Sequence, residues 1–213
     1  LLDGTETVDA ILVGGAPVDF AAAGSRVEFV TAKTPFYAEA GGQVGDRGTA
    51  TGEGVSIEIT DTRRPFGDLV VHIGEVVQGK IQSGQRLELK VDEDAREATR
   101  RNHSATHLLH DALRSVLGDH VRQRGSMVAP DRLRFDFSHL SGMTPEEITQ
   151  VEDEVNDHVL KNNPVVTEVL AYDDAIAAGA IAFFEEKYTD EVRMLRVGQD
   201  SVELCGGTHA RAT

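Results

Sequence analysis

The stretches His103-Ser-Ala-Thr-His107 and Cys205-Gly-Gly-Thr-His209 set the organisation of this chain. Two histidines four residues apart on a helix place both imidazoles on one face. A cysteine and a histidine around a glycine turn can supply two more ligands, which completes the nitrogen and sulfur set that zinc prefers. Cys205 is the only cysteine of the chain and falls inside the second stretch. We therefore predict one zinc site from these four side chains, rather than surface histidines beside a buried thiol.

The first stretch lies in a predicted helix over residues 92–117. Asp92 is a favourable N-cap residue, and Gly118 ends the helix. The apolar positions form one face, and a polar stripe lies on another side of the helix. The stripe consists of Arg100, His103, His107, His110 and Arg114. Its position disfavours core histidines, and it makes His110 either a neighbour of the metal site or a surface residue.

Upstream of this helix the sequence is typical of β-strands. Runs at residues 8–13, 26–31, 55–60, 69–73 and 86–91 carry β-branched residues and alternation, and Gly, Asp and Pro separate them. We predict a small antiparallel β-barrel over residues 1–90.

A glycine-rich loop interrupts these strands, with four glycines in the eight residues from Gly41 to Gly48. Glycine at this density permits positive φ angles or a close approach of the backbone to another group. The loop fits a tight hairpin, and it also fits a loop that approaches a phosphate or nucleotide. The hairpin is favoured by residues alone, because no Gly-Lys-Ser/Thr follows and no strand–loop–helix order is present.

The second half mixes helices and strands without a regular βαβ repeat, which predicts an α+β domain over residues 91–213. Strands are expected at residues 121–128, 133–138, 165–171, 192–197 and 201–204. A helix begins after Thr144, because Pro145 suits its first position and Glu147 completes a capping box. Asp173 is expected to cap a short helix that ends at Gly179.

The composition is that of a globular protein, with 213 residues, 40% of them hydrophobic and 27% charged. No apolar run approaches the length of a membrane span, no signal peptide opens the chain, and a single cysteine excludes internal disulfides. We expect a soluble, cytoplasmic protein with no membrane partner. Because the chain starts with Leu1 and ends soon after His209, we also expect it to be a piece of a longer one.

The formal charge of −15 repels nucleic acid at long range, so an RNA contact needs a local basic patch. Residues 92–134 contain eight arginines against seven acids. Arginine is the side chain best shaped for phosphate. The patch fits a phosphate-binding surface that includes Arg100 and Arg114, and it fits equally well a set of surface ion pairs with the same acids.

Four motifs in register resemble alanyl-tRNA synthetase, in the segment between its tRNA-binding helical part and its C-terminal domain. They are TPFYAEAGGQVGDRG (residues 34–48), NHSATHLLH (102–110), LRFDFSH (133–139) and ELCGGTH (203–209). The resemblance covers essentially the whole chain. It implies that residues 1–90 are the family's β-barrel domain and residues 91–213 its editing domain. The latter fold is similar to the second additional domain of threonyl-tRNA synthetase.

The resemblance also implies roles for individual residues. The family's zinc ligands match His103, His107, Cys205 and His209, which implies one zinc per chain. Gln123 matches a glutamine of the editing pocket and is our candidate catalytic residue. The glycine-rich motif of the family matches the loop from Gly41 to Gly48. Our candidate RNA contacts are Gly41, Gly42, Gln43, Arg100 and Arg114.

The implied activity is editing, the hydrolysis of the ester that joins serine or glycine to alanine tRNA, written tRNA(Ala). The parent enzyme attaches alanine to this tRNA with ATP. The class II catalytic core and its ATP motifs are absent from these residues, so ATP and magnesium belong to that core. No DNA partner is expected. One departure concerns residues 185–189, EEKYT, where the family often has two glycines, and it puts the conformation of this loop in doubt.

Three other functions fit parts of the sequence. A free-standing trans-editing deacylase shares the barrel and the metal motifs, and only the sequence before Leu1 separates it from a synthetase. A zinc-stabilised RNA-binding module would bind mischarged tRNA without hydrolysing it. A threonyl-tRNA synthetase editing domain shares the metal motifs but lacks the GGQVGDRG barrel loop.

Overall fold

The structure, a computed structural model, describes residues 1–182, 189–198 and 201–213. Most of the predicted 185–189 loop therefore lies outside the described residues. The chain forms two compact units, Leu1–Ala40 with Val44–Glu97, and Gly41–Gln43 with Ala98–Thr213. The tip of the glycine-rich loop thus belongs to the second unit. None of the described helices is both long and apolar enough to span a membrane.

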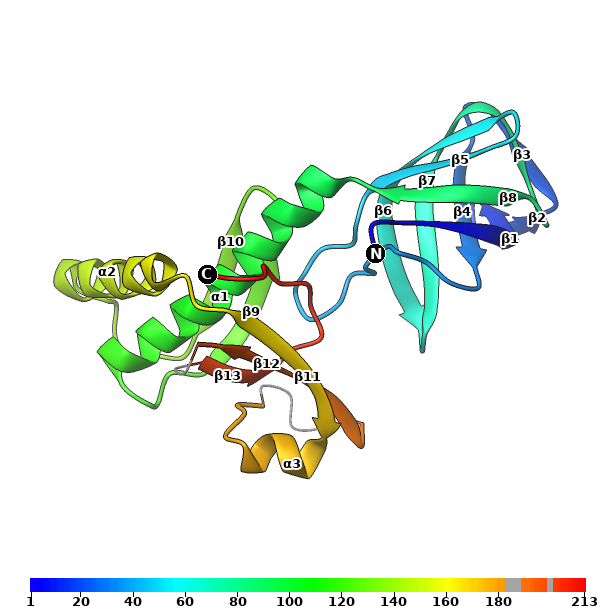
Figure 1. Cartoon of the computed structure of the whole chain (residues 1–213). Coiled ribbons are helices and arrows are strands. Elements are labelled where there is room, and N and C mark those ends of the chain that lie inside the picture. The colour runs from blue at the N-terminus through cyan, green and yellow to red at the C-terminus, as the bar shows by residue number, and fades with distance from the viewer. Residues whose placement is uncertain (183–188, 199–200) are drawn as a thin grey trace. The chain divides into compact units, whose positions relative to one another are not determined.

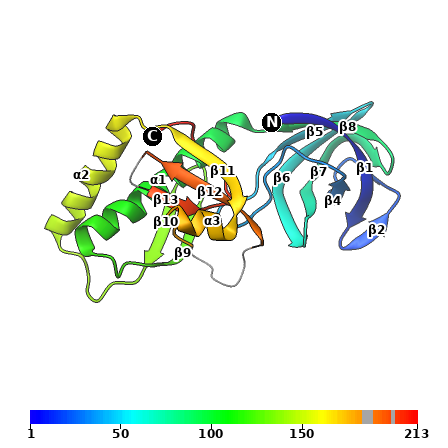
Figure 2. The ribbon, with the colours of Figure 1, turned by 60° about the horizontal axis from the view of Figure 1, so that its bottom comes forward.

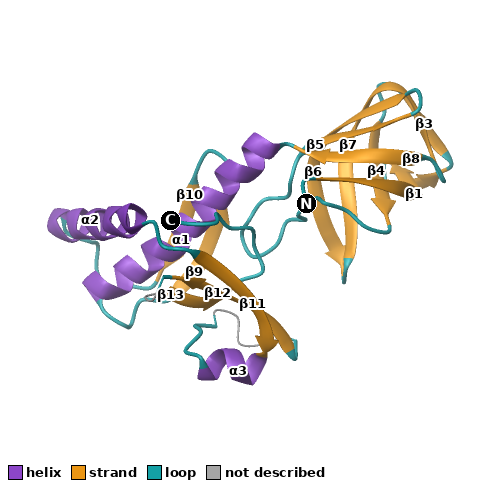
Figure 3. Cartoon of the chain, viewed as in Figure 1, coloured by secondary structure: helices purple, strands orange, loops and turns teal. Residues whose placement is uncertain are grey.

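The first unit is a closed antiparallel β-barrel (Figures 1 and 3). The strands pair in the order β1-β4-β7-β6-β5-β8, and pairing of β8 with β1 closes the ring. Short strands β2 and β3 pair with β1 and β7. The bounds are β1 Asp3–Val13, β2 Ala16–Val18, β3 Phe20–Ala22, β4 Arg26–Thr31, β5 Gly48–Gly52, β6 Val55–Phe66, β7 Leu69–Gln82 and β8 Arg86–Val91. The predicted barrel is confirmed, with longer β1, β6 and β7 than the sequence indicated.

Buried and exposed residues alternate along the strands, and the buried side chains fill the barrel. In β8, Leu87, Leu89 and Val91 point inward, and the residues between them are exposed. A fully buried histidine, His72, stacks on Phe29 with ring centroids 4.7 Å apart. Its Nδ1 donates to the Phe29 carbonyl oxygen at 3.2 Å, because a carbonyl can only accept, and its Nε2 then accepts from the Thr34 hydroxyl at 2.8 Å. His72 is therefore a neutral core residue.

The second unit is α+β, as predicted (Figures 1 and 2). It has a β9–β10 hairpin and a three-stranded antiparallel sheet in the order β11-β12-β13. The bounds are α1 Glu93–Leu117, β9 Gln123–Val128, β10 Leu133–Phe137, α2 Pro145–Lys161, β11 Val165–Ala171, α3 Tyr172–Ala177, β12 Glu191–Val197 and β13 Ser201–Leu204. The long helix α1 begins in the first unit, and its residues from Ala98 onward belong to the second.

The residues predicted to cap the helices do so in α1 and α2 but not in α3. Asp92 Oδ1 accepts from Ala95 N at 3.0 Å at the start of α1, and Thr144 and Glu147 form the predicted capping box of α2. The predicted cap of α3 is wrong. Ala171 occupies the N-cap position without a side-chain hydrogen bond, and Asp173 lies in the first turn, where a carboxylate still favours the positive helix end.

Strand β12 is buried on both faces, which places the end of β13 beside α1. Leu195 and Val197 pack with Leu108 of α1, whereas Val192 and Met194 pack with Ala175 of α3. The sheet therefore carries one helix on each face. Because β13 pairs with β12, the residues that follow Leu204 come out next to the histidine face of α1.

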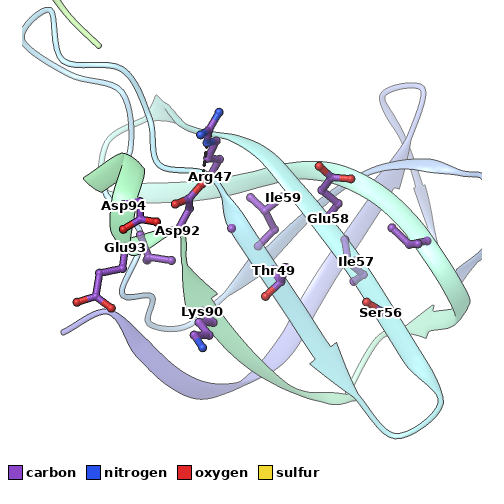
Figure 4. Close-up of a pocket in the computed structure, with 13 residues that line it drawn as sticks. Arg47, Thr49, Ser56, Ile57, Glu58, Ile59, Lys90, Asp92, Glu93 and Asp94 are labelled. Atoms are coloured by element: carbon purple, nitrogen blue, oxygen red, sulfur yellow. Dashed lines mark hydrogen bonds and ion pairs between the residues drawn. The ribbon is translucent and has the colours of Figure 1, made fainter. Parts of the chain in front are cut away.

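The barrel also carries a hollow of about 760 Å³ on strands β5, β6 and β8 (Figure 4). Thr49, Glu58 and Lys90 line it, and an ion pair between Arg47 and Asp92 lies at one end, with Nε and Oδ2 3.0 Å apart. None of the predicted site residues lines this hollow.

Candidate metal centre

The structure brings the four predicted ligands together. One ligand atom from each of His103, His107, Cys205 and His209 lies within 4.8 Å of all the others. The sulfur of Cys205 is 3.4 Å from His103 Nε2 and 3.3 Å from His209 Nε2. In a tetrahedral zinc site with bonds of about 2.0–2.3 Å, ligand atoms lie roughly 3.5 Å apart. The cluster therefore has the dimensions of a single metal site.

Local geometry explains why these residues meet. The helical spacing of His103 and His107 stacks their rings, with centroids 5.3 Å apart and planes 7° from parallel. Glu203 and Cys205 are two residues apart at the end of β13, so both face α1. Gly207 closes the turn, and a Cβ at this position would overlap the His103 ring. The glycine is therefore needed for close packing of the two halves.

The electronic state of the cluster also fits a metal. The Nε2 atom of His107 is buried and forms no hydrogen bond with any residue that the structure describes. A buried polar nitrogen of this kind needs a partner, and a metal ion between imidazoles and a thiolate would supply it. The chain's residues thus fit one transition metal of the zinc type.

Glu203 binds two histidines of α1 through their Nδ1 atoms. Its carboxylate accepts from His107 Nδ1 through Oε2 and from His110 Nδ1 through Oε1, the latter at 2.8 Å. Once His107 has a single proton, the Glu203 carboxylate holds it on Nδ1, and the lone pair is then on Nε2, the atom that faces the cluster. His103 is set in the same way, because its Nδ1 lies 2.7 Å from Gln43 Oε1.

The charges of the site follow from burial and from these contacts. Burial lowers the pKa of His107, but the carboxylate of Glu203 and the sulfur of Cys205 outweigh it and raise the pKa to about 10. Burial favours a neutral thiol at Cys205, yet its contacts with the imidazoles of His103, His107 and His209 hold its pKa well below the ordinary value. Burial also lowers the pKa of His209, to about 4. A metal would therefore meet a thiolate and would displace a proton from His107.

The three histidines of α1 are buried, although their position away from the apolar face of the helix had disfavoured core histidines. His103, His107 and His110 are 6%, 5% and 1% exposed, because the β13 end covers this side of α1. His110 lies behind the cluster as a partner of Glu203. The sheet thus buries a helix face that looked polar in sequence.

Gln123, the candidate catalytic residue, is the first residue of β9 and is partly buried. Its Nε2 donates to Ser126 Oγ at 3.0 Å. The Ser126 side chain in turn lies against Gly42. Gln123 is thus linked through one serine to the glycine-rich segment that reaches the cluster.

The candidate RNA contacts have different surroundings. The guanidinium of Arg114 binds the loop after α1, with Nη2 2.7 Å from Asp119 Oδ1 and Nη1 3.2 Å from the Asp119 carbonyl oxygen. Arg96 is buried in an ion pair with Asp46 and also donates to the Pro35 carbonyl oxygen at 3.0 Å. Arg100 is partly buried on α1. Several arginines of the basic patch therefore serve ion pairs, the second of the two interpretations that the sequence left open.

Gly41 and Gly42 take positive φ angles of 58° and 86°. Gly41 is exposed, whereas the side chain of Gln43 is fully buried in the cluster. The structure therefore places Gln43 where its amide cannot reach an RNA in solution. Its contacts are to His103 and Thr208.

Two residues of the site were missed in the sequence, Glu203 and Thr208. A signal for Glu203 was present, because strand alternation puts it on the same face as Cys205. Thr208 carried no comparable signal, since its backbone N–H matters as a donor to Gln43 Oε1 at 2.9 Å.

Comparison with known proteins agrees with the motifs. The family described as tRNA synthetases class II (A) matches residues 2–95. The alanine–tRNA ligase of Sorangium cellulosum is 58% identical over 92% of this chain, and that of Parvibaculum lavamentivorans is 54% identical over 96%. The alanine–tRNA ligase of Chelativorans sp. is 53% identical over 97% of the chain. The chain spans 22–24% of the length of these relatives. With more than half of its residues identical over nearly its full length, it belongs to the alanyl-tRNA synthetase family.

Proposed function

We propose that this chain is the editing part of an alanine–tRNA ligase and hydrolyses Ser-tRNA(Ala) and Gly-tRNA(Ala). The observation that carries the proposal is the buried cluster of His103, His107, Cys205 and His209 within a chain of this family. Its partner would be mischarged tRNA(Ala) in the cytoplasm, and its cofactor one zinc ion. Aminoacylation with ATP and magnesium would belong to other parts of the parent enzyme.

An editing site is needed because an alanine-binding pocket cannot reject serine and glycine well enough by binding alone. A pocket for alanine loses only one methyl contact with glycine and rejects an added hydroxyl poorly, so binding alone discriminates by about 10–200-fold. A second site that hydrolyses the wrong ester corrects the remaining errors. When bound, zinc supplies a positive charge that can polarise an ester carbonyl or activate water.

The chain's own residues have distinct tasks in this proposal. Glu203 and Gln43 hold two of the histidines with Nε2 toward the cluster. The partly buried amide of Gln123 would orient the substrate, because an amide can donate and accept without binding the metal. The thiolate of Cys205 would be the one negatively charged ligand.

A structural role for zinc is the competing interpretation, because four protein ligands are typical of closed sites. Deacylation of Ser-, Gly- and Ala-tRNA(Ala) by the 213-residue chain separates the two, with zinc content measured on the same samples. We expect about one zinc per chain, hydrolysis of the Ser and Gly esters, and survival of Ala-tRNA(Ala).

Cys205→Ala is expected to lose zinc and to slow hydrolysis at least tenfold, because it removes the only thiolate ligand. His139→Ala is the matched control, since it removes an imidazole of the same unit that hydrogen bonds to His120 at the surface. If a zinc-free Cys205→Ala chain hydrolyses the esters at the rate of the unsubstituted chain, the metal does not take part in hydrolysis. If the unsubstituted chain binds mischarged tRNA without hydrolysing it, the RNA-binding module is favoured.

A further inference from the structure

The glycine-rich segment Gly41–Gln43 is built into the second unit as a short strap on β9. Val128 N donates to the Gly42 carbonyl oxygen at 2.8 Å, and Gln43 forms a parallel bridge with Val128. A Cβ at Gly42 would lie 2.6 Å from the Ser126 carbonyl oxygen, closer than real contacts allow. With both glycines at positive φ, the strap turns sharply and delivers Gln43 to a fully buried position.

The Gln43 amide joins the two halves of the metal cluster. Its Oε1 lies 2.7 Å from His103 Nδ1, on the helix, and 2.9 Å from Thr208 N, in the turn between Cys205 and His209. Its Nε2 donates to Thr208 Oγ1 at 2.9 Å. The amide thus has partners on both the α1 half and the glycine-turn half of the site.

These contacts determine which way the amide points. A backbone N–H can only donate, so Thr208 N requires the oxygen of Gln43 and not its nitrogen at this place. The same oxygen then faces His103 Nδ1, which must carry the ring proton in order to donate. His103 Nε2 is left with a free lone pair, and this is the atom that lies 3.4 Å from the Cys205 sulfur.

We infer that Gln43 is a positioning residue of the metal site, which sets the tautomer of His103 and locks the Cys205–His209 turn onto α1. The inference rests on the metal site of the proposed function and adds a role for the glycine-rich motif. The segment Gly41–Gln43 would strengthen metal binding without contacting the metal, because it holds the candidate ligands in place.

The test compares zinc affinity, measured by chelator competition, in three variants of the 213-residue chain. Gln43→Met keeps the length of the side chain but has no acceptor, and it should bind zinc about 10–100-fold more weakly. Gln43→Glu keeps an acceptor for both His103 and Thr208, and it should restore affinity to within a few-fold of the parent. Gln150→Met, an exposed change on α2, is the matched control and should have no effect.

A second readout distinguishes positioning from a merely structural role. Long-range proton–nitrogen NMR of the metal-free chain should show His103 protonated on Nδ1 in the parent and in Gln43→Glu, but a mixture of tautomers in Gln43→Met. The visible spectrum of the cobalt(II) form should change in Gln43→Met alone, because it reports ligand identity and geometry. If Gln43→Met does not fold, Thr208→Val keeps the backbone N–H and should retain both the tautomer and the affinity, and loss of both in Thr208→Val would overturn the inference.

The outcomes separate this inference from the proposed function. Parental zinc affinity with an unchanged cobalt spectrum in Gln43→Met would overturn the role of Gln43 and leave the editing proposal intact. Weak binding in both Gln43→Met and Gln43→Glu would also overturn it, because the acceptor would not be the determinant. A parent chain that binds no divalent metal would overturn the metal site itself.

Discussion

Glu203 holds His107 in the orientation that a metal ligand needs, with the carboxylate on Nδ1 and the buried Nε2 toward the cluster. The same carboxylate accepts from His110 Nδ1, so one acid serves two imidazoles. Burial raises the pKa of Glu203, but the charge and hydrogen bond of His107 outweigh it and lower the pKa. Glu203 therefore carries its negative charge inside the protein, next to the site.

This relationship predicts the effect of Glu203→Gln. A glutamine can accept from only one of the two imidazoles, and its NH2 group would face the N–H of the other. We expect zinc affinity to fall about 10–100-fold while the fold is retained. Chelator competition measures the change, with the exposed Glu168→Gln as the control. Equal affinity in both variants would mean that Glu203 does not orient His107.

Gln123 should separate chemistry from metal binding. Its amide contacts Ser126 and none of the four ligands in the described contacts, so Gln123→Ala should keep zinc. We expect slower hydrolysis of Ser-tRNA(Ala) or loss of discrimination against Ala-tRNA(Ala), because a misplaced substrate reacts poorly. Deacylation rates and zinc content on one preparation test this. Unchanged rates with all three esters would remove Gln123 from the proposed site.

Arg100 and Arg114, the two arginines of α1 that are candidate RNA contacts, can be tested by the salt dependence of tRNA binding. If Arg100 contacts phosphate, Arg100→Ala should flatten the salt dependence of tRNA binding by about one phosphate equivalent. Arg114 is already bound to Asp119, so Arg114→Ala should leave the slope nearly unchanged and loosen the loop after α1. Binding titrations over a range of salt concentrations measure both. Identical slopes for parent and Arg100→Ala would return Arg100 to a structural role.

The low pKa of His72 predicts that acid lowers the stability of the barrel. Burial lowers its pKa to about 4, whereas the unfolded chain has a value near 6.5. The unfolded state therefore binds the proton first as the pH falls. The contribution is fully present above about pH 6.5 and is lost toward pH 4, by up to about 3 kcal/mol.

Urea unfolding at neutral and mildly acidic pH tests this, with His72→Gln as the comparison. The variant has no titrating group at this position, so its free energy of unfolding should fall less between the two pH values. The difference between the free energies of unfolding of the two chains cancels the pH dependence of the four candidate metal ligands, which both chains share. If the free energy of unfolding falls equally in both chains, protonation of His72 does not cause the loss of stability in acid.

The sequence alone determined most of the elements and which four side chains are the candidate metal ligands. Local signals are sufficient for these, because Asp92, Gly118 and the Thr144–Glu147 capping box act within one turn of chain. The spacing of His103 and His107 on a helix, and of Cys205 and His209 around a glycine turn, likewise needs no long-range information. The alternation in β4 and β8 predicted their bounds for the same reason.

The tertiary structure decided what these ligands touch. Gln43 meets Thr208 and His103 across 165 and 60 residues of sequence, and Glu203 meets His107 across 96. No local pattern specifies such partners, because they depend on how β12 and β13 pack against α1. The same packing buried the histidines that lie away from the apolar face of α1 and put Gln43, expected at an RNA surface, behind His103, a candidate metal ligand. Short strands such as β5, rich in glycine and threonine, also formed only because neighbouring strands supplied their hydrogen bonds.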